Sequence, residues 1–196
     1  MLIANPDFPV RSVPGMIEYL RANPRRYSYG SGGSGTSPHL SMELLKQRTG
    51  VEILHVPYRG GAPAMVDLLT GRIQVMFDNI PTALAAAREG KVRALAVTSA
   101  ERSPAAPDVP AMAEFLPGFE ITSWGGLVGP PGLPAGMVQR MNAFTLRALA
   151  DRHLIEVFQH NAATTWPTTP AGFATFRAEQ EAMFARLIRV AGAHVD

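Results

Sequence analysis

Short apolar runs alternate with helix-like segments through the first 122 positions, and this alternation constrains the fold more than any other feature of the sequence. Strands are predicted at residues 26–30, 51–56, 73–77 and 92–98. Helices are predicted between them, at residues 13–23, 36–50, 64–70 and 82–90. Strands that alternate with helices of about ten residues are typical of βαβ units. We therefore predict an α/β fold with a mostly parallel sheet.

The pattern changes after residue 122, where few strand-like runs remain. Residues 134–160 predict one long or two shorter helices, and residues 169–192 predict another, capped by Thr168 or Thr169. An apolar stripe on the last helix predicts core packing; it consists of Phe173, Phe176, Met183, Phe184, Leu187 and Ile188.

Composition excludes several classes of function. The chain has 196 residues, of which 46% are hydrophobic and 17% are charged, so it can bury a sizeable core. The net charge is only +2 and the charges are scattered, which argues against nucleic acid as a partner. The absence of cysteine excludes disulfides, thiol nucleophiles and thiolate metal sites. The histidines, His194 among them, show no metal-ligand spacing, so no metal or cofactor is expected.

Residues 27–40, YSYGSGGSGTSPHL, place glycine and serine between a predicted strand and a predicted helix. Such runs are flexible spacers when they join domains, but here the flanking elements are only a few residues apart. Gly30, Gly32 and Gly35 also satisfy the dinucleotide pattern G-x-G-x-x-G. That pattern needs an acid near the end of the next strand. Glu52 is the acid at a plausible distance, but it lies at the start of that strand.

A third interpretation is an anion site built from backbone N–H groups. Glycines let the amides turn toward one point, and the helix that begins near Thr36 adds its positive end. Hydroxyl donors come from Ser31, Ser34, Thr36 and Ser37. No lysine follows, as a nucleotide P-loop would require, so the arrangement favours a carboxylate.

Four motifs in sequence order extend this interpretation. They are the glycine run 27–40, VPYRGGAPAMVDLLTGRIQVMFDNIPTAL at 56–84, GKVRALAVTSAERSPAAPDVPAMAE at 90–114 and ITSWGGLVGPPGLP at 121–134. Together the motifs resemble the substrate receptors of tripartite tricarboxylate transporters, also called Bug-type periplasmic binding proteins. The resemblance covers essentially the whole chain.

The resemblance implies a periplasmic-binding-protein-like (Venus-flytrap) fold, in which two α/β domains close on a small carboxylate-bearing ligand. It implies transporter subunits in the membrane as partners and a periplasmic location. The residues it places at the ligand are Ser31, Gly32, Gly33, Ser34, Gly35, Thr36, His39, Asp78, Asn79, Ser123 and Trp124, the last two on a strand that crosses between domains. Positions Ser34, Pro38 and Gly125 depart from residues common in the family, so the ligand site is expected to be altered.

The resemblance also predicts the domain boundaries. Residues 6–122 correspond to one complete domain, and residues 1–5 and 123–196 correspond to a crossover segment and the C-terminal part of the other domain. We expect a chain of this extent to bind more weakly, or to cover its exposed apolar surface by forming a homodimer. Residues 1–10 carry no signal peptide, so a cytoplasmic location is expected if Met1 is the true start.

Several single residues have alternative roles. His39 is expected to hydrogen-bond to the glycine loop or to contact ligand, and His55 to be a satisfied core or rim residue. Asp78 and Asn79 fit either a ligand site at a strand end or a helix cap. Tyr58 and Arg59 are expected either to contact an anionic ligand or to lie in a surface loop. Trp124 is expected either to form a wall of the cleft or to pack within the protein.

The sequence contains neither a Ser–His–acid arrangement nor paired carboxylates, so it predicts no catalytic site. The sequence therefore predicts a non-enzymatic carboxylate-binding receptor. The alternatives are a Rossmann-like oxidoreductase and a dimerising remnant that binds nothing.

Overall fold

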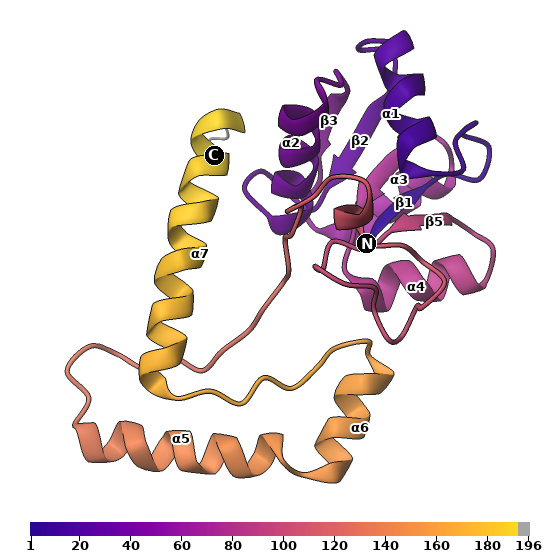
Figure 1. Cartoon of the computed structure of the whole chain (residues 1–196). Helices are drawn as coiled ribbons and strands as arrows, with labels where there is room; N and C mark the ends of the chain where they lie inside the picture. Colours follow the sequence, from indigo (N-terminus) through magenta and orange to yellow (C-terminus); the bar gives the residue numbers. More distant parts are fainter. Residues whose placement is uncertain (192–196) are drawn as a thin grey trace. The chain divides into compact units, whose positions relative to one another are not determined.

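The computed structural model describes residues 1–191, and the predicted helix end at Gly192 and His194 lie outside this range. The chain divides into two compact units, Met1–Ser123 together with the residues from Leu187 onward, and Trp124–Arg186. In chain order the elements are β1 (Leu2–Ala4), α1 (Val13–Ala22), β2 (Ser28–Ser31), α2 (Ser37–Thr49), β3 (Leu54–Pro57), α3 (Gly61–Leu69), β4 (Val75–Phe77), α4 (Ile80–Arg88), β5 (Arg93–Ala96), the 3-10 helix η1 (Met112–Glu114), α5 (Ala135–Leu149), α6 (Arg152–His160) and α7 (Pro170–Ala191), labelled in Figure 1.

The first unit is built on a five-stranded sheet in the order β3-β2-β4-β1-β5. β2 pairs in parallel with both β3 and β4, while β1 runs antiparallel to β4 and β5. The predicted α/β fold with a mostly parallel sheet is therefore confirmed. Because right-handed crossovers lead from β2 outward to β3 and then back to β4, α2 and α3 cover opposite faces of the sheet.

β1 lies where the sequence did not place a strand. Residues 1–5 were expected to belong with the other domain, whereas in the structure Leu2–Ala4 lies inside the sheet of the first unit. β1 pairs with β4 on one side and β5 on the other, and all three of its residues are fully buried. Three apolar residues are too few to show a strand period, so only the pairing partners reveal this strand.

Helix ends in the first unit follow the sequence signals. Ser12 caps α1 by accepting a hydrogen bond from the Gly15 N–H at 3.2 Å. Gly50 ends α2 in the left-handed conformation, at φ +71°. The core packs between sheet and helices, and its largest fully buried side chains include Tyr29, Phe77 and Phe119.

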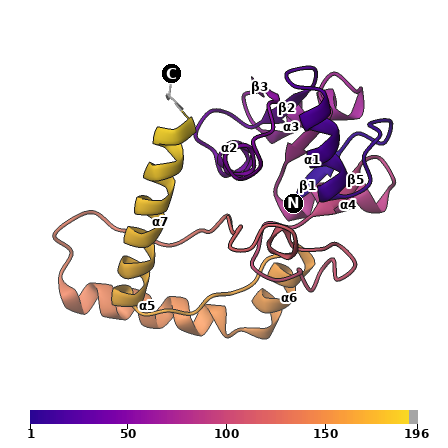
Figure 2. The same cartoon turned by 45° about the horizontal axis from the view of Figure 1, so that its top comes forward.

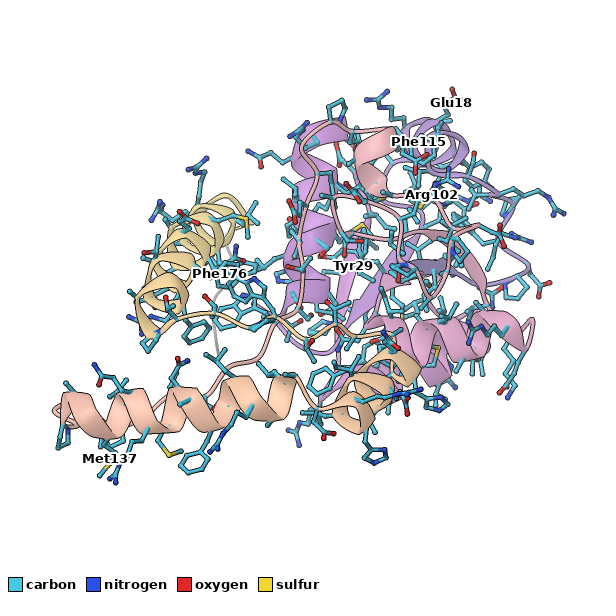
Figure 3. All side chains as sticks on the ribbon, turned by 60° about the horizontal axis from the view of Figure 1, so that its bottom comes forward. Glu18, Tyr29, Arg102, Phe115, Met137 and Phe176 are labelled. Atoms are coloured by element: carbon cyan, nitrogen blue, oxygen red, sulfur yellow. The ribbon has the colours of Figure 1, made fainter. Side chains whose placement is uncertain are left out.

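The second unit consists of α5, α6 and most of α7, and no strand occurs among its residues 124–186. The segment of residues 119–130, expected to contain the crossing strand, is irregular. The Ile121 N–H donates to the Thr98 carbonyl at 3.0 Å, but no strand among the described residues pairs with the segment. Trp124 packs edge-to-face against Phe173 and Phe176 of α7, and Trp166 also packs on Phe176. Figure 3 labels Phe176 beside α7.

The predicted apolar stripe of α7 is only partly buried. Leu187 is buried, Ile188 is 37% exposed, and the remaining members are intermediate. α5 and α6 contain no buried residue. Among residues 1–191, no helix is both long and apolar enough to cross a membrane.

Candidate functional site

Three loops of the first unit meet at one edge of the sheet, by which we mean the side where the parallel strands β2, β3 and β4 have their carboxyl ends. Since β2, β3 and β4 are parallel, their carboxyl ends lie together, and each is followed by a loop that leads into a helix. The Tyr58 N–H donates to the Ser31 carbonyl at 3.0 Å, and the Gly60 N–H donates to the Gly32 carbonyl at 3.2 Å. A ligand site is expected at such an edge in open α/β sheets.

Gly32 allows this close approach. A Cβ atom on Gly32 would lie 3.2 Å from the carbonyl carbon of Gly60 and 3.2 Å from the Gly61 nitrogen. Both neighbours are backbone atoms that cannot rotate away. A side chain at this position would therefore push the glycine loop away from the start of α3.

The N-termini of α2, α3 and α4 all begin at this edge, and none is capped by a side chain. The N-cap residues are Thr36, Gly60 and Asn79, and none of them accepts a first-turn N–H through its side chain. α1, the other long helix of this unit, is capped by Ser12. The first N–H groups of a helix have no partner within the helix and carry a partial positive charge. Three such ends at one edge form a surface that attracts an anion.

The glycine loop, residues 31–36, satisfies much of its own hydrogen bonding. The Ser31 hydroxyl donates to the Gly33 carbonyl at 3.2 Å, and the Thr36 hydroxyl donates to the same carbonyl at 2.7 Å. The Gly33 N–H donates back to the Ser31 hydroxyl at 3.3 Å. Ser31 and Thr36 were expected to supply donors to a ligand, but in the structure both hydroxyls have partners within the loop. Short hydroxyl side chains commonly bond to the nearest backbone groups in this way.

Ser34 and Ser37 lie at the same edge and are half-buried. Among the described residues, neither the Ser34 hydroxyl nor its backbone N–H has a hydrogen-bond partner. Ser37 donates through its hydroxyl to Ser123 at 2.9 Å, and Ser123 donates in turn to the Asn79 side-chain oxygen at 3.0 Å. The chain Ser37–Ser123–Asn79 thus joins the first turn of α2 to the first residue before α4.

Two histidines support the glycine loop from below. His39, in the first turns of α2, is 4% exposed, and its Nδ1 accepts the Gly35 N–H at 3.0 Å. His55 on β3 contacts the Ser31 hydroxyl through Nε2 at 2.7 Å. The two rings stack with their centroids 4.2 Å apart. The hydrogen-bonding role expected for His39 and the satisfied position expected for His55 are therefore observed.

Charged groups beneath this stack are paired with each other. Glu43 accepts hydrogen bonds from the Tyr29 hydroxyl at 2.6 Å and from Lys46 at 2.7 Å. Burial, together with this bond to Glu43, raises the pKa of Tyr29. Burial also lowers the pKa of His39, and burial with the neighbouring His39 lowers the pKa of His55 to about 4. Both imidazoles are therefore neutral near pH 7.

The contact between Ser31 and His55 was not predicted from the sequence. It depends on the parallel register of β2 and β3, which sets Ser31 opposite Pro57 and Tyr29 opposite His55. A serine hydroxyl near an imidazole nitrogen suggests a nucleophile and its base. Ser31, however, has no exposed surface, so a substrate cannot reach its hydroxyl. The pair is structural.

The remaining predicted residues occupy different positions. The Tyr58 hydroxyl donates to Asp67 at 2.7 Å, while Arg59 is exposed. Asp78 accepts a hydrogen bond from the Thr82 hydroxyl at 2.6 Å. Its other carboxylate oxygen lies close to Gly61, 3.2 Å from the position that a Cβ atom would take there. Trp124 belongs to the second unit and is 40% exposed.

The structure does not fit the dinucleotide pattern. Glu52 precedes β3, at the end of the strand opposite the three loops, and pairs with Arg25 at 2.6 Å. No acid is therefore placed for a ribose at the carboxyl end of β3. Within residues 1–191, no group of three or more potential metal ligands is close enough to hold an ion.

Comparison with known proteins identifies one family. The family described as "Tripartite tricarboxylate transporter family receptor" matches residues 1–193. Among curated relatives, a UPF0065 protein from the tcbD-tcbE intergenic region of Pseudomonas sp. (strain P51) is 39% identical over 92% of this chain and 55% of its own length. Protein BugT of Bordetella pertussis is 33% identical over 98% of this chain and 60% of its own length.

Solved structures agree with this result. Rpa4515 of R. palustris, solved with adipate, has a TM-score of 0.90 at 34% identity and covers 98% of this chain. MatC from Rhodopseudomonas palustris, solved with bound malate, has a TM-score of 0.85 at 30% identity and covers 96%. The chain covers 65% of each of these two structures, and between about half and two-thirds of the curated relatives described above.

Proposed function

The chain belongs to the tripartite tricarboxylate transporter receptor family, and from this premise we propose that it binds a small organic acid at the edge formed by the glycine loop and the N-termini of α2, α3 and α4. The family and its solved neighbours, which include the periplasmic binding protein BugD, are solute-binding proteins and not enzymes. We propose that this chain serves a transporter of the tripartite tricarboxylate type from the periplasm.

One observation carries the proposal: three helices of the first unit begin at one edge without side-chain caps. Leaving a first-turn N–H without a partner is unfavourable, and a carboxylate that accepts from such groups removes that cost. Hydrogen bonds to a charged group contribute about 1.5–3 kcal/mol each. Three of them supply much of the roughly −8 kcal/mol of a micromolar complex.

We assign the direct contacts to the groups at this edge that the protein leaves available. They are the N–H and hydroxyl of Ser34 and the first-turn amides of α2, α3 and α4. Ser31, Thr36 and His39 are assigned to shaping the loop, since their polar atoms already have partners within it. Asp78 and Asn79 border the same edge, and Ser123 connects Asn79 to α2.

Two solved neighbours define the chemistry to test. One was solved with adipate and the other with malate, and both compounds are dicarboxylates. Recognition through backbone amides suits any carboxylate, so chain length and hydroxyl substitution of the acid must be read by groups around the edge. We therefore propose a dicarboxylate or tricarboxylate as the ligand class.

A thermal-shift titration of the purified chain tests the proposal. Adipate, malate and citrate are added separately, with adipamide as an uncharged analogue of adipate and NAD as a probe for the dinucleotide alternative. We expect at least one acid to raise the melting temperature, because a ligand at 100 times its Kd stabilises the native state by about 2.7 kcal/mol. Adipamide and NAD should leave the melting temperature unchanged. Stabilisation by NAD but by none of the acids would overturn the proposal.

The same preparation tests the predicted homodimer. Light scattering at several concentrations, with and without the stabilising acid, measures the mass of the particle. A mass of two chains supports the dimer, and a mass of one chain at every concentration excludes it.

A further inference from the structure

His39 and His55 hold opposite ends of the glycine loop and contact each other beneath it. His55 contacts Ser31, where the loop begins, and His39 accepts the N–H of Gly35, near its end. Tyr29 lies against the same stack, 4.7 Å from the His55 ring centroid, and Figure 3 labels this residue beside α2. The loop therefore rests on two stacked rings.

We infer that His39 is a positioning residue whose unprotonated Nδ1 fixes the Gly35 amide and thereby holds the glycine loop in its ligand-binding conformation. This inference rests on the proposed function, because it assigns a role within that same site. It separates His39 from the residues that contact ligand.

The geometry assigns one tautomer to His39. Nδ1 accepts the Gly35 N–H at 3.0 Å, so in the neutral ring the proton must be on Nε2. Nε2 faces the Glu43 carboxylate at 3.9 Å, which favours a proton on that side. Glu43 is itself held by Tyr29 and Lys46, so its carboxylate has a fixed position beneath the ring.

Gly35 has a left-handed backbone conformation, with a φ of +80°. Nothing lies within 4 Å of the position where a Cβ would be, so no group packs on that side of the residue. The bond from its N–H to His39 ties it to the rigid first turns of α2, which Figure 2 shows nearly along the helix axis.

Protonation of His39 would reverse this contact. A proton on Nδ1 would point at the Gly35 N–H, so that two donors would face each other across 3.0 Å. The titratable and charged groups that surround the ring are Glu43 and Lys46 on α2, Tyr29 on β2 and His55 on β3. Glu43 is the only acid among them, and it is already paired with Lys46. We therefore expect the loop to lose its binding geometry when His39 becomes charged.

Two substitutions of His39 separate the two ring nitrogens. His39→Asn places a side-chain oxygen near the position of Nδ1 and preserves an acceptor for Gly35. His39→Gln places its amide near the position of Nε2 and removes that acceptor. Binding of adipate is measured by calorimetry for the wild type and both variants between about pH 5 and pH 8, the range in which histidine changes charge.

The expected result is a different pattern for each variant. Near pH 8, His39→Gln should bind about five- to tenfold more weakly than the wild type, which corresponds to one lost hydrogen bond. His39→Asn should stay within about twofold of the wild type. Toward pH 5 the wild type should lose affinity relative to His39→Asn. Because the acid itself titrates identically in both measurements, the ratio of the two affinities reports the stacked pair, namely His39 and its effect on the neighbouring His55.

A measurement without ligand completes the test. In the wild-type protein, nitrogen chemical shifts of the His39 ring should show an unprotonated Nδ1, and the Gly35 amide signal should move with the titration of His39. A protonated Nδ1 at neutral pH, or a Gly35 signal that is the same in His39→Gln, would overturn the inference. Failure of all acids to bind the wild type would instead contradict the proposed function, and the ring shifts would still decide the role of His39.

Discussion

The ring of His39 stacks on that of His55 with their centroids 4.2 Å apart and an angle of 18° between their planes. Two cations could not remain at this distance in a buried site. The native state therefore disfavours a charge on both imidazoles, and this couples the stability of the first unit to pH.

Stability should fall as the pH decreases from about 6.5 to about 4. Burial and the neighbouring His39 lower the pKa of His55 to about 4, whereas an unfolded histidine titrates near its ordinary value. In this range the unfolded chain binds more protons than the native chain, so acid favours unfolding. Allowing for solvent around a half-buried ring, the loss is about 1–2 kcal/mol. Urea unfolding at several pH values measures it.

His55→Gln is the matched variant for this prediction. Its amide can still reach the Ser31 hydroxyl, but it carries no titratable group. The variant should show a smaller decrease in stability than the wild type over the same pH range. An equal decrease in both proteins would show that other groups cause the pH dependence.

Gly35→Ala should weaken binding of adipate, whereas Gly50→Ala should not. Both glycines have positive φ, +80° and +71°, and nothing lies within 4 Å of an added Cβ at either position. Each substitution should therefore cost about 1 kcal/mol of stability through backbone strain alone. Only Gly35 lies in the glycine loop, so only its variant should also change affinity. Urea unfolding measures the stability of both variants, and calorimetry measures their affinity for adipate. Equal affinities would show that the glycine loop is not part of the ligand site.

Part of the fold could be predicted because its signals are local. The cap at Ser12, the left-handed glycine at Gly50 and the apolar face of α1 are all encoded within a single turn or helix. β1 could not be predicted because its three residues become a strand only through pairing with β4 and β5. The crossing strand at Ser123 and Trp124 was expected from the family resemblance, but no partner strand pairs with these residues among residues 1–191.

The site shows the same division. The glycine loop, its position after a strand and the helix that follows were readable from residues 27–40. The bond between Ser31 and His55 was not, because it depends on the register of two strands separated by α2. The hydroxyl of Thr36 was expected to face a ligand, but its partner is the Gly33 carbonyl three residues earlier. Sequence motifs predicted the candidate site, and only coordinates assigned its hydrogen bonds.

Ser123→Ala should weaken adipate binding about fivefold, as expected when one hydrogen-bonded link is removed. Ser123 accepts a hydrogen bond from the Ser37 hydroxyl and donates one to the Asn79 side chain, so it links the first turn of α2 to the N-cap of α4. Without it the two helix ends are free to separate. Ser99→Ala is the control, because the Ser99 hydroxyl makes an exposed bond to the Glu101 carbonyl outside this edge. Calorimetry on both variants decides, and matching losses would show that Ser123 has no specific role.

Phe176→Ala should loosen the second unit without changing the first. The Phe176 ring packs edge-to-face on Trp124 at 5.3 Å and on Trp166 at 4.6 Å between centroids. Since the chain has two tryptophans and both lie in this unit, intrinsic fluorescence reports on the second unit alone.

We expect a red-shifted emission from Phe176→Ala and a loss of about 1–2 kcal/mol in the unfolding transition followed by fluorescence, because the ring is only partly buried. Phe144→Ala on α5 is the matched control, since that ring is 60% exposed and packs on Arg147, away from either tryptophan. It should leave the emission maximum unchanged. If both variants shift the emission equally, the cluster around Phe176 does not organise this unit. If neither variant shifts the emission and Phe176→Ala unfolds like the wild type, the contacts of Phe176 with Trp124 and Trp166 do not stabilise this unit.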